Sequence, residues 1–265
     1  MQFANINGIT LHYQVISAPD DKPTLVFSNS LGTDFRIWRD VIVRFVGECS
    51  LVLYDKRGHG LSDAPPAPYT MQDHADDLIG LMDHLGLSDA IVCGLSVGGL
   101  IAQTVLHDRP DLIRALILCN TAAKLGTDAM WNERIAQVEE GGMDAITDGV
   151  MEKWFTPHFR SERATDTAGY RNMVARIPVD GYIGTSMAIR DTDLRQKALD
   201  IKVPAIAISG DQDGSVPHEV VLSTAKLIPD CRYEMLKNCG HIPCVEQPEM
   251  LVEIIKAFMV DAELA

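Results

Sequence analysis

Ser96 stands between two glycines in the pentapeptide GLSVG (residues 94–98), directly after an apolar run at residues 90–93. A helical pattern follows, so the serine lies in a strand-to-helix turn. A turn this tight requires glycine on either side, because side chains there would collide. It also places the hydroxyl at the N-terminal end of a helix, where peptide dipoles favour developing negative charge. The pattern G-x-S-x-G in this context predicts a serine nucleophile.

A nucleophilic serine needs a base, and the base needs a group that orients it. His241 follows a glycine in a loop before the last helical pattern, where its imidazole can reach a neighbouring strand end. Two aspartates, Asp211 and Asp213, come directly after the apolar run at residues 205–209. Either of them could orient the histidine. The chain order serine, aspartate, histidine is the one expected for this kind of turn.

The other histidines and the cysteines are expected to be structural. Six cysteines in a chain of this length are typical of free thiols. Cys239, His241 and Cys244 lie close together, but no second ligand pair has a suitable spacing, so we predict no metal site. Four histidines lack a comparable loop context, which favours surface or packing roles for them. These are His59, His74, His84 and His107.

The composition restricts the partners that the chain can have. Its 265 residues can bury a substantial core, and one α/β domain of this size is common. A formal net charge of −14 repels nucleic acid and anionic lipid, so neither is expected as a partner. The N-terminus has no signal-peptide pattern, and glycines and polar residues interrupt the most apolar stretch, residues 90–106. We therefore expect a cytoplasmic protein, whose oligomeric state the sequence does not determine.

Short apolar runs alternate with helical patterns along most of the chain. An alternating segment at residues 9–15 predicts a half-exposed strand. Runs that are apolar on both faces predict buried parallel strands; they are residues 24–27, 50–54, 90–93, 115–119 and 205–209. Helical patterns lie between and after these runs, at residues 71–85, 100–107 and 249–260. The alternation predicts an α/β fold with a mostly parallel, doubly wound sheet.

The alternation breaks at residues 122–198. This stretch lacks buried-strand runs, is rich in helix formers and holds most of the tryptophans. Since it lies between two core strands, the chain must leave the sheet and return. We predict a core of residues 1–121 and 199–265, with residues 122–198 inserted as a helical cap over one end of the sheet.

Four motifs, in this order, resemble the α/β-hydrolase superfamily over nearly the whole chain. They are DKRGHGLS at residues 55–62, the turn at Ser96, the loop of Asp213 and the loop of His241. The resemblance implies an α/β-hydrolase fold and a catalytic triad of these three residues. It favours Asp213 over Asp211, which is left to brace its loop. The RGHG part of the first motif is expected to turn the chain after a strand.

Hydrolases of this superfamily need two backbone N–H groups for the oxyanion hole. One is expected from Val97 and the other from Leu31, in the loop after the strand at residues 24–27. Many members carry His-Gly in this loop. Aligned on Trp38, this chain has Asn29 in place of that histidine. Because the donor is a backbone group, the substitution need not abolish the hole, and it favours a subfamily that shares it.

Three segments resemble those of enol-lactonases that act on 3-oxoadipate enol-lactone. They are NSLGTD at residues 29–34, WFTP at residues 154–157, and residues 181–194. The resemblance implies a serine hydrolase that opens this lactone to 3-oxoadipate in the degradation of aromatic compounds. It implies no metal and no organic cofactor.

The partner implied by this resemblance is a small anionic lactone, so an acidic protein must supply a cation near the serine. Trp131 and Trp154 could form an aromatic wall that desolvates such a cation. Basic residues of the cap are the candidates: Arg134, Lys153, Arg176 and Arg190. Each of them can also be a solvated helix-face charge.

Several other functions remain open. A broad carboxylesterase, a cofactor-free haloperoxidase or perhydrolase, and a C–C bond hydrolase would use the same triad. A non-catalytic ligand receptor on the same fold belongs to another class, and it predicts a damaged triad that the sequence does not contain. Haloalkane dehalogenases and epoxide hydrolases need aspartate at the turn, so Ser96 argues against both.

Overall fold

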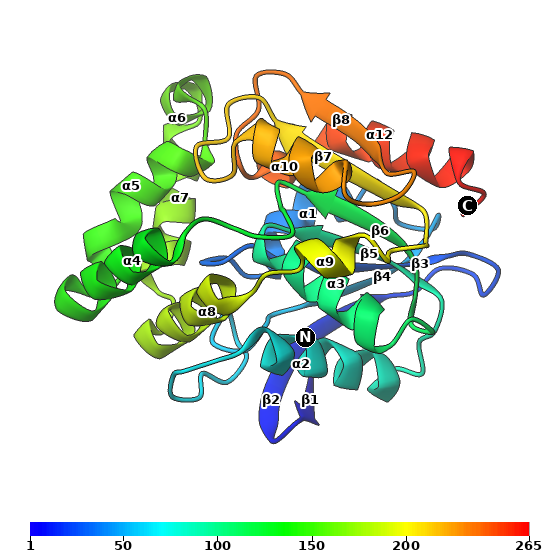
Figure 1. Ribbon diagram of the computed structural model, residues 1–265, viewed down its shortest axis with the longest axis horizontal. Helices are drawn as coiled ribbons and strands as arrows, with labels where there is room; N and C mark the ends of the chain where they lie inside the picture. Colours follow the sequence, from blue (N-terminus) through cyan, green and yellow to red (C-terminus); the bar gives the residue numbers. More distant parts are fainter. Residues whose placement is uncertain (265) are drawn as a thin grey trace.

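A twisted β-sheet runs through the centre of the computed structural model, which describes residues 1–264 (Figure 1). Its strands have the order β1-β2-β4-β3-β5-β6-β7-β8. The strands are β1 Gln2–Ile6, β2 Ile9–Ile16, β3 Thr24–Ser28, β4 Ser50–Tyr54, β5 Ala90–Leu95, β6 Ile113–Cys119, β7 Ala205–Gly210 and β8 Arg232–Leu236. From β4 to β8 neighbouring strands are parallel, and β1 and β2 extend the sheet in antiparallel fashion. The predicted mostly parallel sheet is therefore confirmed.

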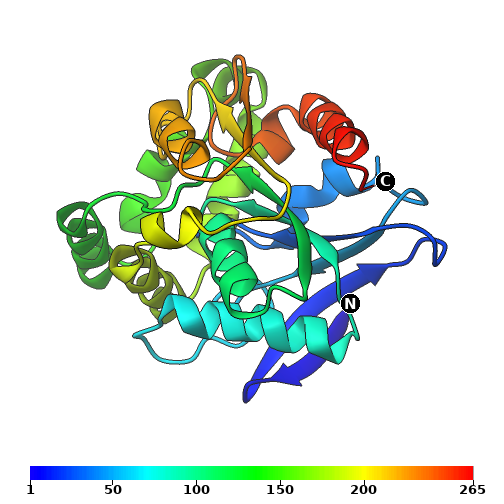
Figure 2. The ribbon, with the colours of Figure 1, turned by 45° about the vertical axis from the view of Figure 1, so that its right-hand side comes forward.

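Helices cover both faces of this sheet, as a parallel sheet requires. Figure 2 shows α2, α3 and α10 on one face and α1 and α12 on the other. These core helices are α1 Arg39–Ile42, α2 Met71–His84, α3 Val97–Asp108, α10 His218–Ala225, α11 Pro243–Glu246 and α12 Pro248–Asp261, with a short 3₁₀ helix at Phe35–Trp38. The two strands that the sequence analysis missed, β1 and β8, lie at the sheet edges. Neither forms a fully buried apolar run, which explains why no such signal was present.

Residues 122–198 form six helices, of which α4 to α8 lie at the left of Figure 1 and α9 lies near its centre. They are α4 Asp128–Gly141, α5 Asp144–Trp154, α6 Pro157–Glu162, α7 Ala164–Ala175, α8 Val179–Asp191 and α9 Arg195–Ala198. Side chains from α4, α5 and α8 face the loops after β3, β5 and β8 across one cavity. This arrangement places the segment over the carboxyl ends of the strands. The division into a core and a separate cap unit stays a prediction, and "cap" below means residues 122–198.

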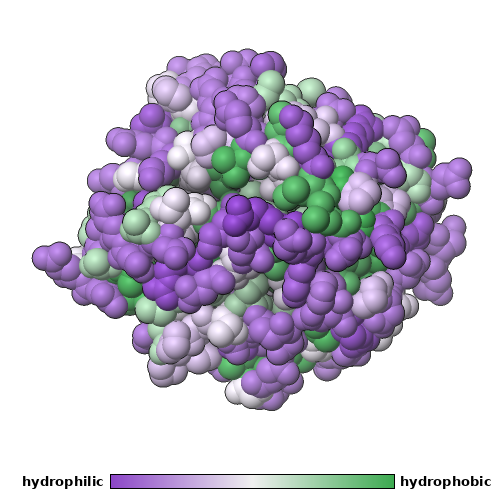
Figure 3. Space-filling view, in the orientation of Figure 1, coloured by the Kyte–Doolittle hydropathy of each residue, from purple (hydrophilic) through white to green (hydrophobic). Residues whose placement is uncertain are grey.

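The surface is mostly polar on the face drawn in Figure 3, where apolar side chains form smaller areas between hydrophilic ones. The apolar side chains of the central strands are buried instead, and they form one continuous core with those of the flanking helices. Within residues 1–264, every helix falls short of the length and apolar character that a membrane span needs.

Candidate active site

Ser96 occupies a strained turn between β5 and α3. Its backbone has φ 57° and ψ −120°, a conformation that L-residues rarely adopt and that costs about 1–3 kcal/mol. A Cβ on Gly94 would lie 2.4 Å from the carbonyl oxygen of Gly98, and one on Gly98 would lie 2.1 Å from that of Ser28. Both positions therefore require glycine, and the turn holds the serine at the tip of the strand.

Asp213 lies against His241. Its Oδ2 is 2.7 Å from Nδ1 of the imidazole, and both side chains are buried. The other carboxylate oxygen accepts the N–H groups of Ser215 and Val216, at 2.7 and 2.9 Å, so the carboxylate is fixed in place. Asp211 instead accepts the N–H of Cys239 at 3.3 Å. Of the two aspartates that the sequence analysis considered, Asp213 is thus the one that contacts the histidine.

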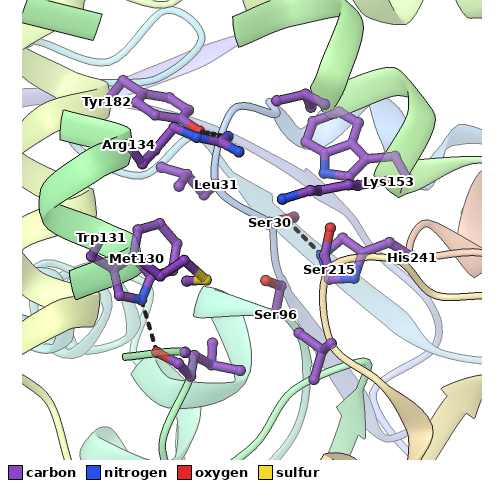
Figure 4. Close-up of a pocket in the computed structure, with 15 residues that line it drawn as sticks. Ser30, Leu31, Ser96, Met130, Trp131, Arg134, Lys153, Tyr182, Ser215 and His241 are labelled. Carbon is purple, nitrogen blue, oxygen red and sulfur yellow. Dashed lines mark hydrogen bonds between the residues drawn. The ribbon is translucent and has the colours of Figure 1, made fainter. Parts of the chain in front are cut away.

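Ser96 and His241 line the same cavity (Figure 4). The contact with Asp213 through Nδ1 turns the opposite nitrogen, Nε2, toward this space. Ser30, which the sequence analysis did not single out, also lines the cavity, and its Oγ lies 3.4 Å from Nε2. Ser96, Asp213 and His241, which are far apart in the sequence, therefore lie together at one end of the sheet. This placement suits an activated alcohol and its base.

The loop after β3 presents the second expected oxyanion donor. Asn29 fixes the start of this loop, since its amide donates to the carbonyl of Tyr54 and its Oδ1 accepts the indole N–H of Trp38, both at 2.9 Å. Among residues 1–264, neither the N–H of Leu31 nor that of Val97 has a protein acceptor. Both residues are buried, and unpaired buried N–H groups are rare, so binding of a ligand oxygen would account for the two free donors.

Side chains of the DKRGHG motif form hydrogen bonds with the backbone of the loop after β3. The ammonium of Lys56 donates to the carbonyl oxygens of Ser30 at 2.6 Å and Thr33 at 3.3 Å. The N–H of Gly32 donates to Nε2 of His59 at 3.0 Å. Burial, assisted by the charge of Lys56, holds the pKa of His59 well below its usual range, so this ring stays neutral and can accept. The motif does more than turn the chain, because it fixes the backbone next to Ser96.

The loop of His241 is tied to both the core and the cap. Asn120, at the end of β6, donates to the carbonyl oxygens of Gly240 and His241 at 3.1 and 2.9 Å. Glu246 accepts the N–H of Gly240 at 2.9 Å, and burial raises the pKa of this carboxyl group. The N–H of His241 donates to the carbonyl of Trp154 at 2.7 Å. Single Asn and Glu residues carry no sequence signal for such roles.

The cap supplies the upper wall of the cavity, which has a volume of about 100 Å³. Arg134 and Lys153 both point into it from above Ser96 (Figure 4). Nη1 of Arg134 donates to the hydroxyl of Tyr182 at 3.1 Å, and Trp131 is anchored through its indole N–H. Neither cation forms an ion pair with a carboxylate among residues 1–264. Two basic side chains therefore meet the cavity without a neutralising acid.

The predicted substrate contacts divide into two groups. Trp131, Arg134, Lys153 and Trp154 line the cavity. Arg190 does not, because its guanidinium pairs with Asp191 at 2.7 Å and with Asn132 at 2.8 Å outside the cavity. Arg176, just after α7, is exposed and also absent from the cavity wall. The prediction that Arg190 binds the substrate is therefore corrected: it is a half-buried residue of the cap that lies outside the cavity lining.

The cysteines near His241 are buried thiols. Burial raises the pKa values of Cys239 and Cys244, which favours the protonated form over the thiolate that binds metals. Within the described range, no three His, Cys, Asp or Glu side chains are grouped so that they could hold a metal ion.

The chain is similar to known hydrolases in both sequence and structure. The family model described as "alpha/beta hydrolase fold" matches residues 23–248. Two 3-oxoadipate enol-lactonases of Acinetobacter baylyi are 32% and 29% identical to the chain, over 95% and 98% of it and 93% and 96% of their own lengths. The crystal structure of the enol-lactonase from Burkholderia xenovorans LB400 superposes with a TM-score of 0.94. It is 34% identical and covers 98% of this chain and 100% of its own.

Proposed function

The chain belongs to the α/β-hydrolase fold family and is a hydrolase of ester and lactone bonds, and from this premise we propose that its substrate is 3-oxoadipate enol-lactone. The product would be 3-oxoadipate, formed during the degradation of aromatic compounds. The observation that carries the proposal is the pair of unneutralised cations, Arg134 and Lys153, beside Ser96 in a protein of net charge −14. Such a pocket favours a small anionic substrate.

Acylation begins when Ser96 attacks the lactone carbonyl while His241 takes the hydroxyl proton. Asp213 orients the imidazole and stabilises its positive charge. The N–H groups of Val97 and Leu31 then bind the oxygen of the tetrahedral intermediate. In serine hydrolases, one such donor contributes about 3–4 kcal/mol to the stability of the transition state.

Collapse of the intermediate breaks the ring C–O bond and expels an enolate oxygen. An enolate is a better leaving group than an alkoxide, and the proton held by His241 converts it to an enol. The enol becomes the ketone, which draws the opening forward. Water activated by His241 then attacks the acyl group on Ser96 and releases the second carboxylate. The triad and one water account for every proton in this scheme, so the proposal includes no cofactor.

The free carboxylate of the lactone would bind between Arg134 and Lys153. Arg134 is held by Tyr182 and is half-buried, whereas Lys153 is exposed. Hydrogen bonds to charged groups contribute most where solvent is excluded, so Arg134 is the stronger candidate. Trp131 and Trp154 would shield this contact from water. A reducing, cytoplasmic setting completes the proposal, since all six cysteines are free thiols.

The proposal is tested by presenting purified protein with the enol-lactone and with p-nitrophenyl acetate and butyrate. We expect kcat/KM for the lactone to exceed that for either ester by at least about 100-fold, because only the lactone engages the cations with charged hydrogen bonds. A preference for the simple esters would instead identify a broad carboxylesterase. Binding of the lactone without turnover would identify a ligand receptor.

A further inference from the structure

The carbonyl of Ser30 and the N–H of Leu31 belong to one peptide group. The N–H side has no protein acceptor among residues 1–264, and Leu31 lines the cavity of Ser96. The carbonyl side accepts hydrogen bonds from Nζ of Lys56 at 2.6 Å and from Oγ1 of Thr33 at 2.8 Å. One face of this peptide is therefore saturated with donors, while the other face is open to the substrate.

The neighbouring N–H in the same loop is already in use. Gly32 donates to Nε2 of His59 at 3.0 Å, and Nδ1 of His59 lies 3.1 Å from the carbonyl of Arg57. That second contact makes Nδ1 the protonated nitrogen and leaves Nε2 as the acceptor. The loop thus keeps the Leu31 N–H as its donor for a ligand and holds the next N–H away from it.

A packing role alone does not explain Lys56, because burying its charge costs free energy. Lys56 is 1% exposed, and within residues 1–264 no carboxylate lies at ion-pair distance from its ammonium. Its acceptors are the two carbonyl oxygens of the loop after β3. A methionine could fill the same space without a buried charge. The position of the ammonium is therefore better explained by what it does to the Ser30–Leu31 peptide.

A cation that binds a peptide oxygen draws electron density from the peptide nitrogen. The N–H on that nitrogen becomes a stronger donor, because hydrogen bonds in a chain polarise one another and do so most strongly where solvent is excluded. The same contact fixes the plane of the peptide, so the N–H direction is set before substrate binds. Both effects act on charge that develops in the transition state rather than on the neutral substrate.

We propose that Lys56 is a positioning residue of the oxyanion hole, whose ammonium binds the Ser30 carbonyl and thereby aims and strengthens the Leu31 N–H. The proposal rests on the proposed function only in taking Leu31 as an oxyanion donor. It extends to any ester or lactone that Ser96 attacks, whatever the substrate carries elsewhere.

The test compares wild type with Lys56→Met, which keeps the length and apolar stem of the side chain, and Lys56→Gln, which keeps an uncharged donor. Removing a whole oxyanion donor lowers kcat by about 10²–10³-fold, so weakening one donor should lower kcat by about 10- to 100-fold in Lys56→Met. KM should change less than about twofold, since ground-state contacts are untouched. Lys56→Gln should lie between the two proteins.

A matched control is Lys124→Met. Lys124 also donates to a backbone carbonyl, that of Arg190 at 2.5 Å, but it lies outside the cavity wall. Its replacement should leave kcat within about twofold, because no donor of the oxyanion hole is affected. Circular dichroism would verify that each variant is folded, and Lys56→Gln keeps the test valid if the methionine variant does not fold.

Inhibitor binding separates positioning from a general loss of structure. Phenylboronic acid forms an anionic tetrahedral adduct with a reactive serine and places one oxygen in the oxyanion hole, whereas adipate offers only carboxylates to the pocket. The Ki of the boronic acid should rise in Lys56→Met by the factor lost in kcat/KM, and the Kd of adipate should stay constant. Equal losses for both ligands would overturn the proposal, as would an unchanged kcat.

The pH dependence offers a readout that packing alone would not change. Desolvation lowers the pKa of Lys56 to about 7, opposed by the charges of Asp34 and Asp55, and the buried neutral rings of His59 and His74 face the same ammonium. The ratio of kcat/KM between wild type and Lys56→Met should therefore be larger at pH 6.5 than at pH 8.5. A constant ratio would count against the role of the charge.

Two substrates distinguish a wrong assignment of the substrate from a wrong assignment of the role of Lys56. If wild type hydrolyses p-nitrophenyl acetate but not the enol-lactone, the proposed substrate is wrong, and the ester still measures the effect of Lys56→Met. If wild type opens the lactone and Lys56→Met does so equally well, the proposed function stands and the positioning role falls.

Discussion

The backbone N–H of His241 donates to the backbone carbonyl of Trp154 over 2.7 Å, which links the candidate base directly to the cap. Glu246 strengthens this link, because one of its carboxylate oxygens accepts from Gly240 and the other accepts both the N–H and the hydroxyl of Thr156. The end of α5 and the histidine loop therefore form one hydrogen-bonded unit. Displacing the cap at this point would displace the imidazole.

Replacing Glu246 with glutamine should loosen that unit. The glutamine amide must direct an NH₂ group at one of the donors that the carboxylate now accepts, which leaves buried polar groups unpaired. We expect the free energy of unfolding to fall by about 1–3 kcal/mol and kcat to fall with it. Urea denaturation and steady-state kinetics would measure both. Glu253→Gln, an exposed change on α12, should alter neither, and equal behaviour of the two variants would refute the link.

The two aspartates of the loop after β7 should differ sharply. Asp213→Asn removes the carboxylate that orients His241 and stabilises its cationic form, so kcat should fall by about three to four powers of ten. Asp211→Asn keeps an oxygen that can accept from Cys239, so kcat should fall less than about tenfold. Single-turnover kinetics on the lactone would separate the acylation step. Comparable losses in the two variants would mean that the contact seen at Asp213 is not the catalytic one.

The sequence pointed to Ser96, Asp213 and His241 because each follows a strand at the carboxyl edge of a parallel sheet, and such loops carry local signals. Lys56 had no such signal. Its partner Ser30 lies on a neighbouring strand's loop, 26 residues away, so its role depends on how β3 and β4 pair. His59 was expected to have a surface or packing role, because its sequence context showed no partner. What it contacts, the N–H of Gly32, comes from the loop after β3.

The sequence also could not show which charged side chains of the cap helices face the cavity. Arg134 on α4 and Arg190 at the end of α8 both stand near aromatic or polar neighbours in a helical segment. Only the packing of α4 against α8 decides which side chain faces the cavity. The edge strands β1 and β8 were missed because their partly exposed faces lack the apolar runs that mark central strands.

Arg134 and Arg190 form a natural pair for testing recognition of the substrate carboxylate. Arg134→Gln should raise KM for the enol-lactone by about 10- to 100-fold, the equivalent of one hydrogen bond to a charged group. KM for p-nitrophenyl acetate, which is neutral, should not change. Arg190→Gln should leave KM for both substrates unaltered, because that guanidinium is paired outside the cavity. A rise in KM for both substrates in Arg134→Gln would point to a damaged pocket rather than a lost charge contact.

The burial of Lys56 should make the stability of the protein depend on pH. Its pKa is lowered from 10.5 to about 7, chiefly by desolvation. Between these values the unfolded chain binds a proton that the folded protein does not, so the free energy of unfolding should rise with pH, by at most about 1.4 kcal/mol per pH unit. Below pH 7 Lys56 is protonated in both the folded and the unfolded protein, so it no longer makes the free energy of unfolding depend on pH.

Lys56→Met should lack this rise and, near neutral pH, should be at least as stable as wild type, because the cost of a buried charge is removed. Urea denaturation of both proteins at pH 7, 8, 9 and 10 would give the difference between them, from which other titrating groups cancel. The difference should shrink or reverse as the pH increases. Parallel curves for the two proteins would show that Lys56 titrates at its ordinary pKa. Higher stability combined with a lower kcat in this variant would show that the buried ammonium serves the reaction at the expense of the fold.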